Sequence, residues 1–438
     1  MSEISNLINL QSKLKDKKID LLIVNRSDEF LNEYISPNAE RLNFITNFSG
    51  SAGRAIITPT DAFLYVDGRY TFQANKQINV KEIKARHLNS FWQDLEKILL
   101  EKKSKIALDP ILHSIIEIKK VQKILENSKS QLLLIHKNFI DLIWENQPKI
   151  LYTDIFDHPT SFAGQSRHEK LDILKKFLDE NEIDHYFVSG LDNIAWLLNL
   201  RADDIKYTPL LYSYLLISKN NKHSLYIKES AISEKLKTEI QTLININNIE
   251  NIELIFNNIN SSESIGLDFN FTTYYFLDLL DKRKINYKNL NNPCILLKAI
   301  KNEIEQDGAM KANIRDGLSV TKYIYWLKNK MDINNNNEIS VAKHLKSLRY
   351  ENKLFHSLSF DTISAIGKNA ALPHYRVSED SNTNFSSNKI YLVDSGAQYY
   401  DGTTDITRTI IIGKASLEQK EMFTRVLKGS YFIIKSYF

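Results

Sequence analysis

Two aspartates near the end of the chain are the residues best placed to do chemistry. Asp394 and Asp405 lie on strand-like segments that flank a turn at Asp401-Gly402. Because Asp-Gly tolerates positive φ, we expect these segments to form a hairpin that brings both carboxylates into a protected site. Buried neighbouring carboxylates repel each other unless they are protonated or hold a cation. The pair therefore indicates either a divalent metal site or, as the alternative, two solvated turn residues.

A histidine lies upstream of the aspartate pair. His374 follows a strand-like segment, Leu358–Ser364, on a loop rich in glycine and alanine. A neutral imidazole beside two acids can transfer protons or stabilise an oxyanion. A surface histidine with no chemical role explains the residue equally well.

These two segments closely resemble the catalytic domain of Xaa-Pro aminopeptidase (aminopeptidase P), a pita-bread metallopeptidase. The resemblance rests on the run Asp401–Thr409, on the spacing of the two aspartates and on His374. It extends over the chain, since Phe48–Gly53, Asp67–Tyr70 and Leu191–Arg201 resemble segments of the two N-terminal domains of that family. The long, three-domain form of the family is the one that the sequence resembles.

The resemblance implies a function for each of these residues. Asp394 would chelate one ion of a dinuclear manganese site, Asp405 would bridge both ions, and a hydroxide between them would attack the peptide bond before proline. His374 would be catalytic and substrate-binding, since it would contact the substrate and stabilise the tetrahedral intermediate. Arg69 matches a substrate-contacting arginine, although a salt bridge at the end of a hairpin explains it equally well. The expected substrates are peptides with proline at the second position.

The sequence departs from the family pattern after Asp405. The family uses a histidine and two glutamates further along as metal ligands, but no histidine follows His374, and Glu418 and Glu421 belong to a helical pattern. We therefore expect the chain to be C-terminally truncated and inactive alone. Two alternatives are one half of a split enzyme, completed by a separate polypeptide, and a non-catalytic interaction module that forms a homodimer.

The elements that must position these residues predict an α/β (α+β) fold in three parts. We expect creatinase-like N-terminal domains at 1–150 and 151–302 and an incomplete pita-bread metallopeptidase domain at 303–438. A repeat supports duplication of the first domain, because four residues recur 164 positions later: Ile19, Asp20, Val24 and Asp28 match Ile183, Asp184, Val188 and Asp192. Trp196 is expected to pack within the second domain.

Three helices are predicted in the third part. They cover 302–330, 338–350 and a last segment that starts at Ser416, where Ser416 and Gln419 form a capping box. Apolar residues in the last helix recur at spacings of three and four as far as Phe438. Without the rest of the pita-bread fold, we expect this helix to fray or to expose an apolar patch.

Composition limits the remaining options. The chain has 438 residues, 43% of them hydrophobic and 25% charged, with a net charge of +4, so neither disorder nor nucleic-acid binding is indicated. No segment approaches the ~20 apolar residues that span a membrane, and the N-terminus does not resemble a secretory signal. We therefore expect a cytoplasmic protein without a membrane partner. Cys294 is the only cysteine, which excludes an intramolecular disulfide, and it is expected to be a buried or half-buried, small apolar residue.

Overall fold

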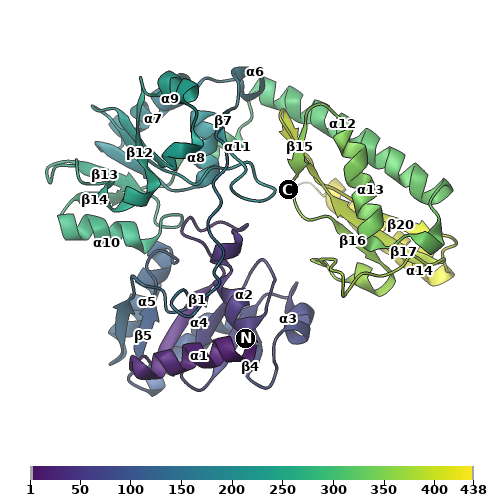
Figure 1. The fold of residues 1–438 in the computed structure, drawn as a ribbon, viewed down its shortest axis with the longest axis horizontal. Helices are drawn as coiled ribbons and strands as arrows, with labels where there is room; N and C mark the ends of the chain where they lie inside the picture. The colour runs from purple at the N-terminus through teal and green to yellow at the C-terminus, as the bar shows by residue number, and fades with distance from the viewer. Residues whose placement is uncertain (1–2, 437–438) are drawn as a thin grey trace. The chain divides into compact units, whose positions relative to one another are not determined.

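The chain divides into two compact units, residues 1–302 and 303–438 (Figure 1). The computed structural model describes residues 3–436, and no helix within this range is long and apolar enough to cross a membrane. Both units mix helices and strands, which confirms the predicted fold class.

Two six-stranded sheets form the framework of the first unit. Their strand orders are β4-β3-β2-β1-β5-β6 and β12-β11-β10-β8-β13-β14. The first sheet comprises β1 (Leu21–Asn25), β2 (Arg54–Ile57), β3 (Ala62–Val66), β4 (Ile83–His87), β5 (Lys105–Leu108) and β6 (Gln131–Leu134). The second comprises β8 (His185–Val188), β10 (Tyr214–Ser218), β11 (His223–Ile227), β12 (Ile244–Asn248), β13 (Ser264–Leu267) and β14 (Asn286–Asn289). A short pair, β7 (Phe156–Asp157) and β9 (Leu200–Arg201), lies apart from both sheets.

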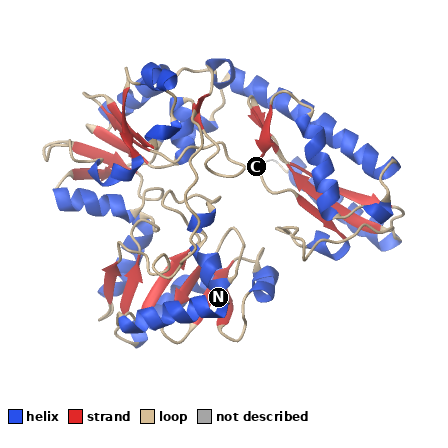
Figure 2. Cartoon of the chain, in the orientation of Figure 1, coloured by secondary structure: helices blue, strands red, loops and turns tan. Residues whose placement is uncertain are grey.

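Helices accompany both sheets of this unit, as Figure 2 shows. Those with the first sheet are α1 (Glu3–Asp16), α2 (Arg41–Thr46), α3 (Thr71–Gln77), α4 (Phe91–Glu101) and α5 (Ile115–Glu126). The others are α6 (Thr160–Ala163), α7 (Arg167–Glu180), α8 (Leu191–Leu198), α9 (Glu234–Ile240), α10 (Tyr274–Arg283) and α11 (Pro293–Ala299). Side chains alternate between the two faces of a strand, so Leu22 and Val24 of β1 enter one apolar core while Leu21 and Ile23 enter another. Such continuous apolar strands are typical of sheets that are covered on both faces.

The predicted duplication is confirmed by the topology of the two sheets. In the first sheet, β1 pairs antiparallel with β2 and parallel with β5. In the second sheet, β8 pairs in the same way with β10 and β13. Asp20 and Asp184, one of the recurring pairs, make equivalent contacts: each accepts a 2.8 Å hydrogen bond at Oδ2, from the backbone N–H of Lys105 and of Ser264, respectively. Each aspartate thus fastens the start of a central strand to its parallel neighbour.

Two predictions about buried residues in this unit are also confirmed. Cys294 is fully buried and Trp196 is buried in the core around the second sheet.

Over its described residues, the second unit contains three α-helices and two small sheets. Its helices are α12 (Glu303–Asn329), α13 (Glu338–Tyr350) and α14 (Leu417–Lys435). Helices α12 and α13 pack against the sheets. One sheet has the order β15-β18-β19, from Phe355–Leu358, Ala397–Tyr399 and Gly402–Thr403. The other has the order β16-β17-β20, from Ile363–Ile366, Lys389–Ser395 and Ile406–Ile412.

A single strand over Leu358–Ser364 was a wrong prediction. The chain leaves one sheet after Leu358 and joins the other at Ile363, because β15 pairs with β18 whereas β16 pairs with β17. The break is fixed by Ser359, whose N–H donates to Gly396 O and whose Oγ donates to Thr404 O. Gly396 lies between β17 and β18, and Thr404 lies between β19 and β20, so both partners are at breaks between strands of the two sheets.

The apolar residues spaced along helix α12 mark its buried face only toward its C-terminal end, where Leu327 is buried. Met310, Ile314 and Leu318 are all more than half exposed. The helix is buried instead through residues that are mostly small or polar: Gly308, Ala312, Asp316, Ser319, Val320, Tyr323 and Leu327. Small side chains at successive turns allow the hairpin of β18 and β19 to approach the helix closely.

Helix α14 has its predicted capping box, formed by Ser416 and Gln419. No described residue of this helix is buried. The expected exposed apolar patch is therefore confirmed over the described part of the helix, while Phe438 lies outside the described residues.

Candidate active site

Strands β17 and β20 bring Asp394 and Asp405 together. In their antiparallel register Asp394 is opposite Thr407, and Asp405 precedes Thr407 by two residues. Since side chains alternate along a strand, this spacing puts the two carboxylates on the same face of the sheet. Partial desolvation raises the pKa of Asp405, and both the charge of Asp394 and a hydrogen bond between the two side chains raise it further.

One oxygen of the pair has no partner in the protein. Oδ1 of Asp394 is buried and makes no hydrogen bond. A buried carboxylate oxygen normally finds a donor or a cation, because leaving it unpaired costs roughly 1–3 kcal/mol. Carboxylate oxygens are also the ligands that hard divalent cations prefer. The two side chains therefore fit a metal ion, although residues 3–436 contain no group of three or more His, Cys, Asp or Glu side chains that could hold one.

The predicted protection of this pair holds only for Asp394. Asp394 is half-buried, but Asp405 is exposed. Asp405 immediately precedes β20, which has a paired neighbour on one side only in the described sheet. The site that these residues form is therefore open on the side of Asp405.

The turn between the strands also differs from the prediction. Neither Asp401 nor Gly402 has a positive φ. Gly402 is needed for another reason, because a Cβ atom there would lie 3.0 Å from Cβ of Ala312 on helix α12. Asp401 accepts two 2.8 Å hydrogen bonds from Arg315 of the same helix, at Oδ1 and Oδ2. The turn is thus held by its contact with α12 and not by its own backbone preference.

His374 is half-buried in a turn of the loop between β16 and β17. The next residue, Tyr375, is buried and donates a 2.8 Å hydrogen bond to Oε2 of Glu338 on helix α13. The carboxylate of Glu338 is completely buried and also accepts hydrogen bonds from the backbone N–H groups of Ile366 and Thr383. Sequence reasoning missed this anchor, which fastens the loop on both sides of His374.

Arg69 lies in the first unit, just after strand β3. Its Nε and Nη2 donate to the two oxygens of Asp67, at 3.0 and 2.6 Å, and its side chain is 48% exposed. The guanidinium also lies over the ring of Tyr70. The salt bridge that the sequence offered as an alternative is therefore present, while half of the side chain stays open to solvent.

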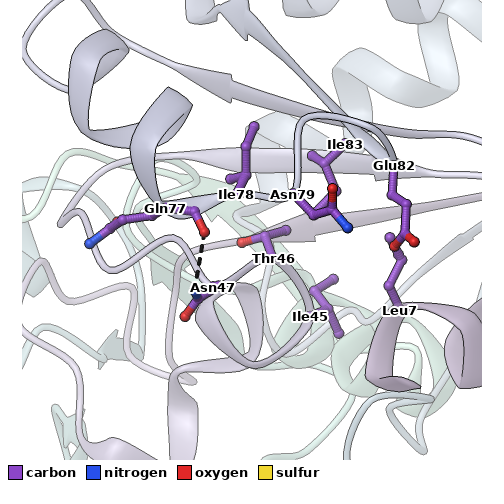
Figure 3. A pocket seen from close by; sticks show the side chains of 9 residues that line it. All are labelled: Leu7, Ile45, Thr46, Asn47, Gln77, Ile78, Asn79, Glu82 and Ile83. Carbon is purple, nitrogen blue, oxygen red and sulfur yellow. Dashed lines mark hydrogen bonds between the residues drawn. The ribbon is translucent and has the colours of Figure 1, made fainter. Parts of the chain in front are cut away.

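A separate pocket of about 200 Å³ lies in the first unit (Figure 3). It contains none of the residues predicted to act on a substrate. Inside it, Nδ2 of Asn47 donates a 3.1 Å hydrogen bond to Gln77 O. Its walls are formed by Leu7, Ile45, Thr46, Asn47, Gln77, Ile78, Asn79, Glu82 and Ile83.

Three family models match nearly the whole length of the chain. The metallopeptidase family M24 matches residues 308–438. Two models of the Creatinase/Prolidase N-terminal domain match residues 7–139 and 146–305.

Similar proteins carry one recurring name. A protein of Paracoccidioides lutzii named "Probable Xaa-Pro aminopeptidase P" is 34% identical over 96% of this chain and 71% of its own length. One of the same name from Aspergillus niger is also 34% identical, over 97% and 71%. The crystal structure of the X-prolyl aminopeptidase from Caenorhabditis elegans, described as a cytosolic enzyme with a di-nuclear active site, is 27% identical. It superposes with a TM-score of 0.88 over 95% of this chain and 71% of that one.

Proposed function

Because the chain belongs to the Xaa-Pro aminopeptidase family of metallopeptidases, we propose that it serves the metal-dependent hydrolysis that releases an N-terminal residue preceding proline. The observation that carries this proposal is the pair of Asp394 and Asp405, with the unpartnered, buried Oδ1 of Asp394. Its substrates are peptides with proline at the second position.

In this proposal each candidate residue has one role. Asp394 and Asp405 hold two divalent metal ions, for which we propose manganese, in a site completed by ligands from outside the described residues. When bound, such ions activate water and polarise the scissile carbonyl. His374 contacts the substrate and donates a hydrogen bond to the oxygen that becomes negative during hydrolysis. Arg69, half exposed beside Asp67, binds the substrate through its guanidinium group.

The arrangement of the chain supports the same proposal. We propose domains at 1–150, 151–302 and 303–438, since the two sheets of the first unit fall in the first two ranges and the second unit begins at Glu303. We also propose a cytoplasmic location, as stated for the relative from Caenorhabditis elegans.

A polypeptide of these 438 residues alone supplies two carboxylates and no later histidine. We propose that it does not hydrolyse Xaa-Pro peptides alone, because each missing ligand weakens metal binding and leaves the attacking water unoriented. Activity would then need the remaining metal ligands of the family site. A non-catalytic interaction module that forms a homodimer is the alternative.

The experiment that tests this function joins residues 1–438 to the part of the Paracoccidioides lutzii relative beyond the matched region. With Mn²⁺, this chimera should release the N-terminal residue of an Ala-Pro-Phe peptide, and Asp394→Asn or Asp405→Asn should abolish release. Residues 1–438 alone should release none. A folded chimera whose release persists in both variants would rule out the proposed roles of the aspartates.

A further inference from the structure

A buried ion pair contacts the residues next to Asp394 and Asp405. Asp316 of helix α12 and Arg349 of helix α13 both have side chains with no exposed surface. Nε of Arg349 donates a 2.7 Å hydrogen bond to Oδ1 of Asp316, and Nη2 donates a 2.9 Å bond to Oδ2. The pair joins the two helices in a bidentate geometry, which fixes the orientation of both side chains.

Each member of the ion pair also contacts the residue next to one candidate metal ligand. Nη2 of Arg349 donates a 3.1 Å hydrogen bond to Oγ of Ser395, which directly follows Asp394. Oγ1 of Thr404, which directly precedes Asp405, donates a 2.8 Å bond to Oδ2 of Asp316. The ion pair therefore spans the gap between the two strands at the position of the aspartates.

Further contacts close this arrangement around Thr404. Its Oγ1 accepts a 3.0 Å hydrogen bond from the N–H of Ala397, and Oη of Tyr399 donates a 2.9 Å bond to Oδ1 of Asp316. Gly396 contributes by its lack of a side chain, because a Cβ atom there would overlap with the carbonyl oxygen of Thr404. The segments that carry Asp394 and Asp405 are thus locked to each other and to both helices.

We infer that Asp316 and Arg349 are positioning residues, which set the separation and direction of the Asp394 and Asp405 carboxylates through Ser395 and Thr404. Stability alone does not explain a buried ion pair, since apolar residues of similar volume often stabilise a fold as much or more. Metal ligands, by contrast, must be held to within about 0.5 Å by neighbouring groups whose own positions are fixed. This inference rests on the proposed function. The separation of the two carboxylates can nevertheless be measured without metal and without activity.

The test is a double-mutant cycle for Asp394→Asn and Asp405→Asn in the full chain. Urea unfolding of residues 303–438 is followed by hydrogen exchange of its core peptides at pH 8. Because the carboxylates repel each other at short range, Asp405→Asn should raise the urea midpoint more when Asp394 is present than when it is already asparagine. The size of this difference reports how closely the two side chains are held.

The cycle is repeated in three backgrounds. Thr404→Val removes the hydroxyl that reaches Asp316 but leaves the Asp316–Arg349 pair intact, and Thr404→Ser restores the hydroxyl. Tyr323→Phe is the matched control, because it removes a buried hydroxyl of helix α12 that is hydrogen-bonded at 2.8 Å to Tyr391, three residues before Asp394 on β17. Arg349→Lys, which keeps the charge but loses the bidentate geometry, tests the ion pair itself where that variant folds.

The coupling is the extra rise in urea midpoint that Asp405→Asn causes when Asp394 is present. This coupling should fall at least two-fold in Thr404→Val, return in Thr404→Ser and stay unchanged in Tyr323→Phe. A coupling that persists in Thr404→Val, or that falls equally in Tyr323→Phe, would assign the network a purely structural role. A wild-type chain without any coupling would also overturn the inference. Failure of the chimera to cleave peptides would contradict the proposed function and leave this result standing.

Discussion

Thr404 donates a 2.8 Å hydrogen bond from Oγ1 to Oδ2 of Asp316, which lies 88 residues earlier in the chain. This contact ties the residue before Asp405 to the middle of helix α12. The position of a candidate metal ligand at the edge of a small sheet is therefore determined from the helix behind it. The contact explains how the backbone next to an exposed carboxylate can be held in place beside Asp394.

Removing the charge of Asp405 should not destabilise the protein. In the absence of metal, Asp405→Asn relieves the repulsion from Asp394, so we expect the free energy of unfolding of residues 303–438 at pH 7 to stay constant or rise. The measurement is urea unfolding followed by hydrogen exchange. Asp401→Asn is the matched control in the same hairpin, and should cost about 1–3 kcal/mol because it breaks the bidentate contact with Arg315. A loss of more than about 1 kcal/mol in Asp405→Asn would indicate a strong structural partner.

The loop that carries His374 should depend on Glu338. An amide at this position cannot accept all the hydrogen bonds that the buried carboxylate receives, so Glu338→Gln should cost roughly 2–3 kcal/mol. Hydrogen exchange across residues 367–383 should accelerate at least ten-fold. Glu351→Gln, which removes an exposed partner of Lys322, should change stability by less than about 0.5 kcal/mol. Unchanged exchange in Glu338→Gln would show that the loop is held by other contacts.

Acid should destabilise the first unit through Glu117. Burial alone would raise the pKa of Glu117, but His113, Arg54 and Asn25 outweigh it and lower this pKa to about 2. A carboxylate with a lowered folded-state pKa stabilises the fold fully above its unfolded value of about 4.5, and this contribution is lost as the pH falls toward 2.

We expect this contribution to be on the order of 3 kcal/mol. Between pH 5 and pH 2, Glu117→Gln should therefore flatten the pH dependence of the urea midpoint of the first unit. The surface variant Glu101→Gln should leave the dependence unchanged. A wild-type slope retained in Glu117→Gln would place the acid sensitivity elsewhere.

Helix α14 should associate through its apolar face. Its large side chains are mostly exposed, including Phe432 at 69% and Ile433 at 64%. We expect rapid hydrogen exchange across residues 428–436 and concentration-dependent self-association in analytical ultracentrifugation. Replacing Phe432 and Ile433 together by serine should weaken association at least ten-fold, whereas Lys428→Ser should not. Strong protection of this helix in a monodisperse protein would contradict the prediction.

The sequence predicted the elements whose patterns are local. The cap at Ser416 was identifiable, because capping residues act on their immediate neighbours. The hairpin around Asp401 was predicted correctly, although its turn is held by the contact of Asp401 with Arg315 and not by a positive φ. Strand β4 (Ile83–His87) was missed, since its apolar alternation is limited to Ile83 and Ala85 before the polar end of this edge strand.

The support of the site could not be predicted in the same way. Asp316 and Arg349 are 33 residues apart and meet only through the packing of two helices. The signal within α12 was the spacing of Gly308, Ala312 and Asp316, small residues and then a carboxylate on successive turns of one face. The prediction of this helix relied instead on its apolar residues, several of which are exposed in the structure.

The most direct test of the account is whether Asp394 and Asp405 hold a divalent ion together. Mn²⁺ broadens nuclear magnetic resonance signals near its binding site even when it binds weakly and exchanges rapidly, so it can be added stepwise to the isotopically labelled full chain. We predict that amide signals of residues 394–396 and 404–407 disappear first, and that the double variant Asp394→Asn/Asp405→Asn retains them at the same Mn²⁺ concentration. Broadening that begins elsewhere, or that is the same in the double variant, would contradict the central claim.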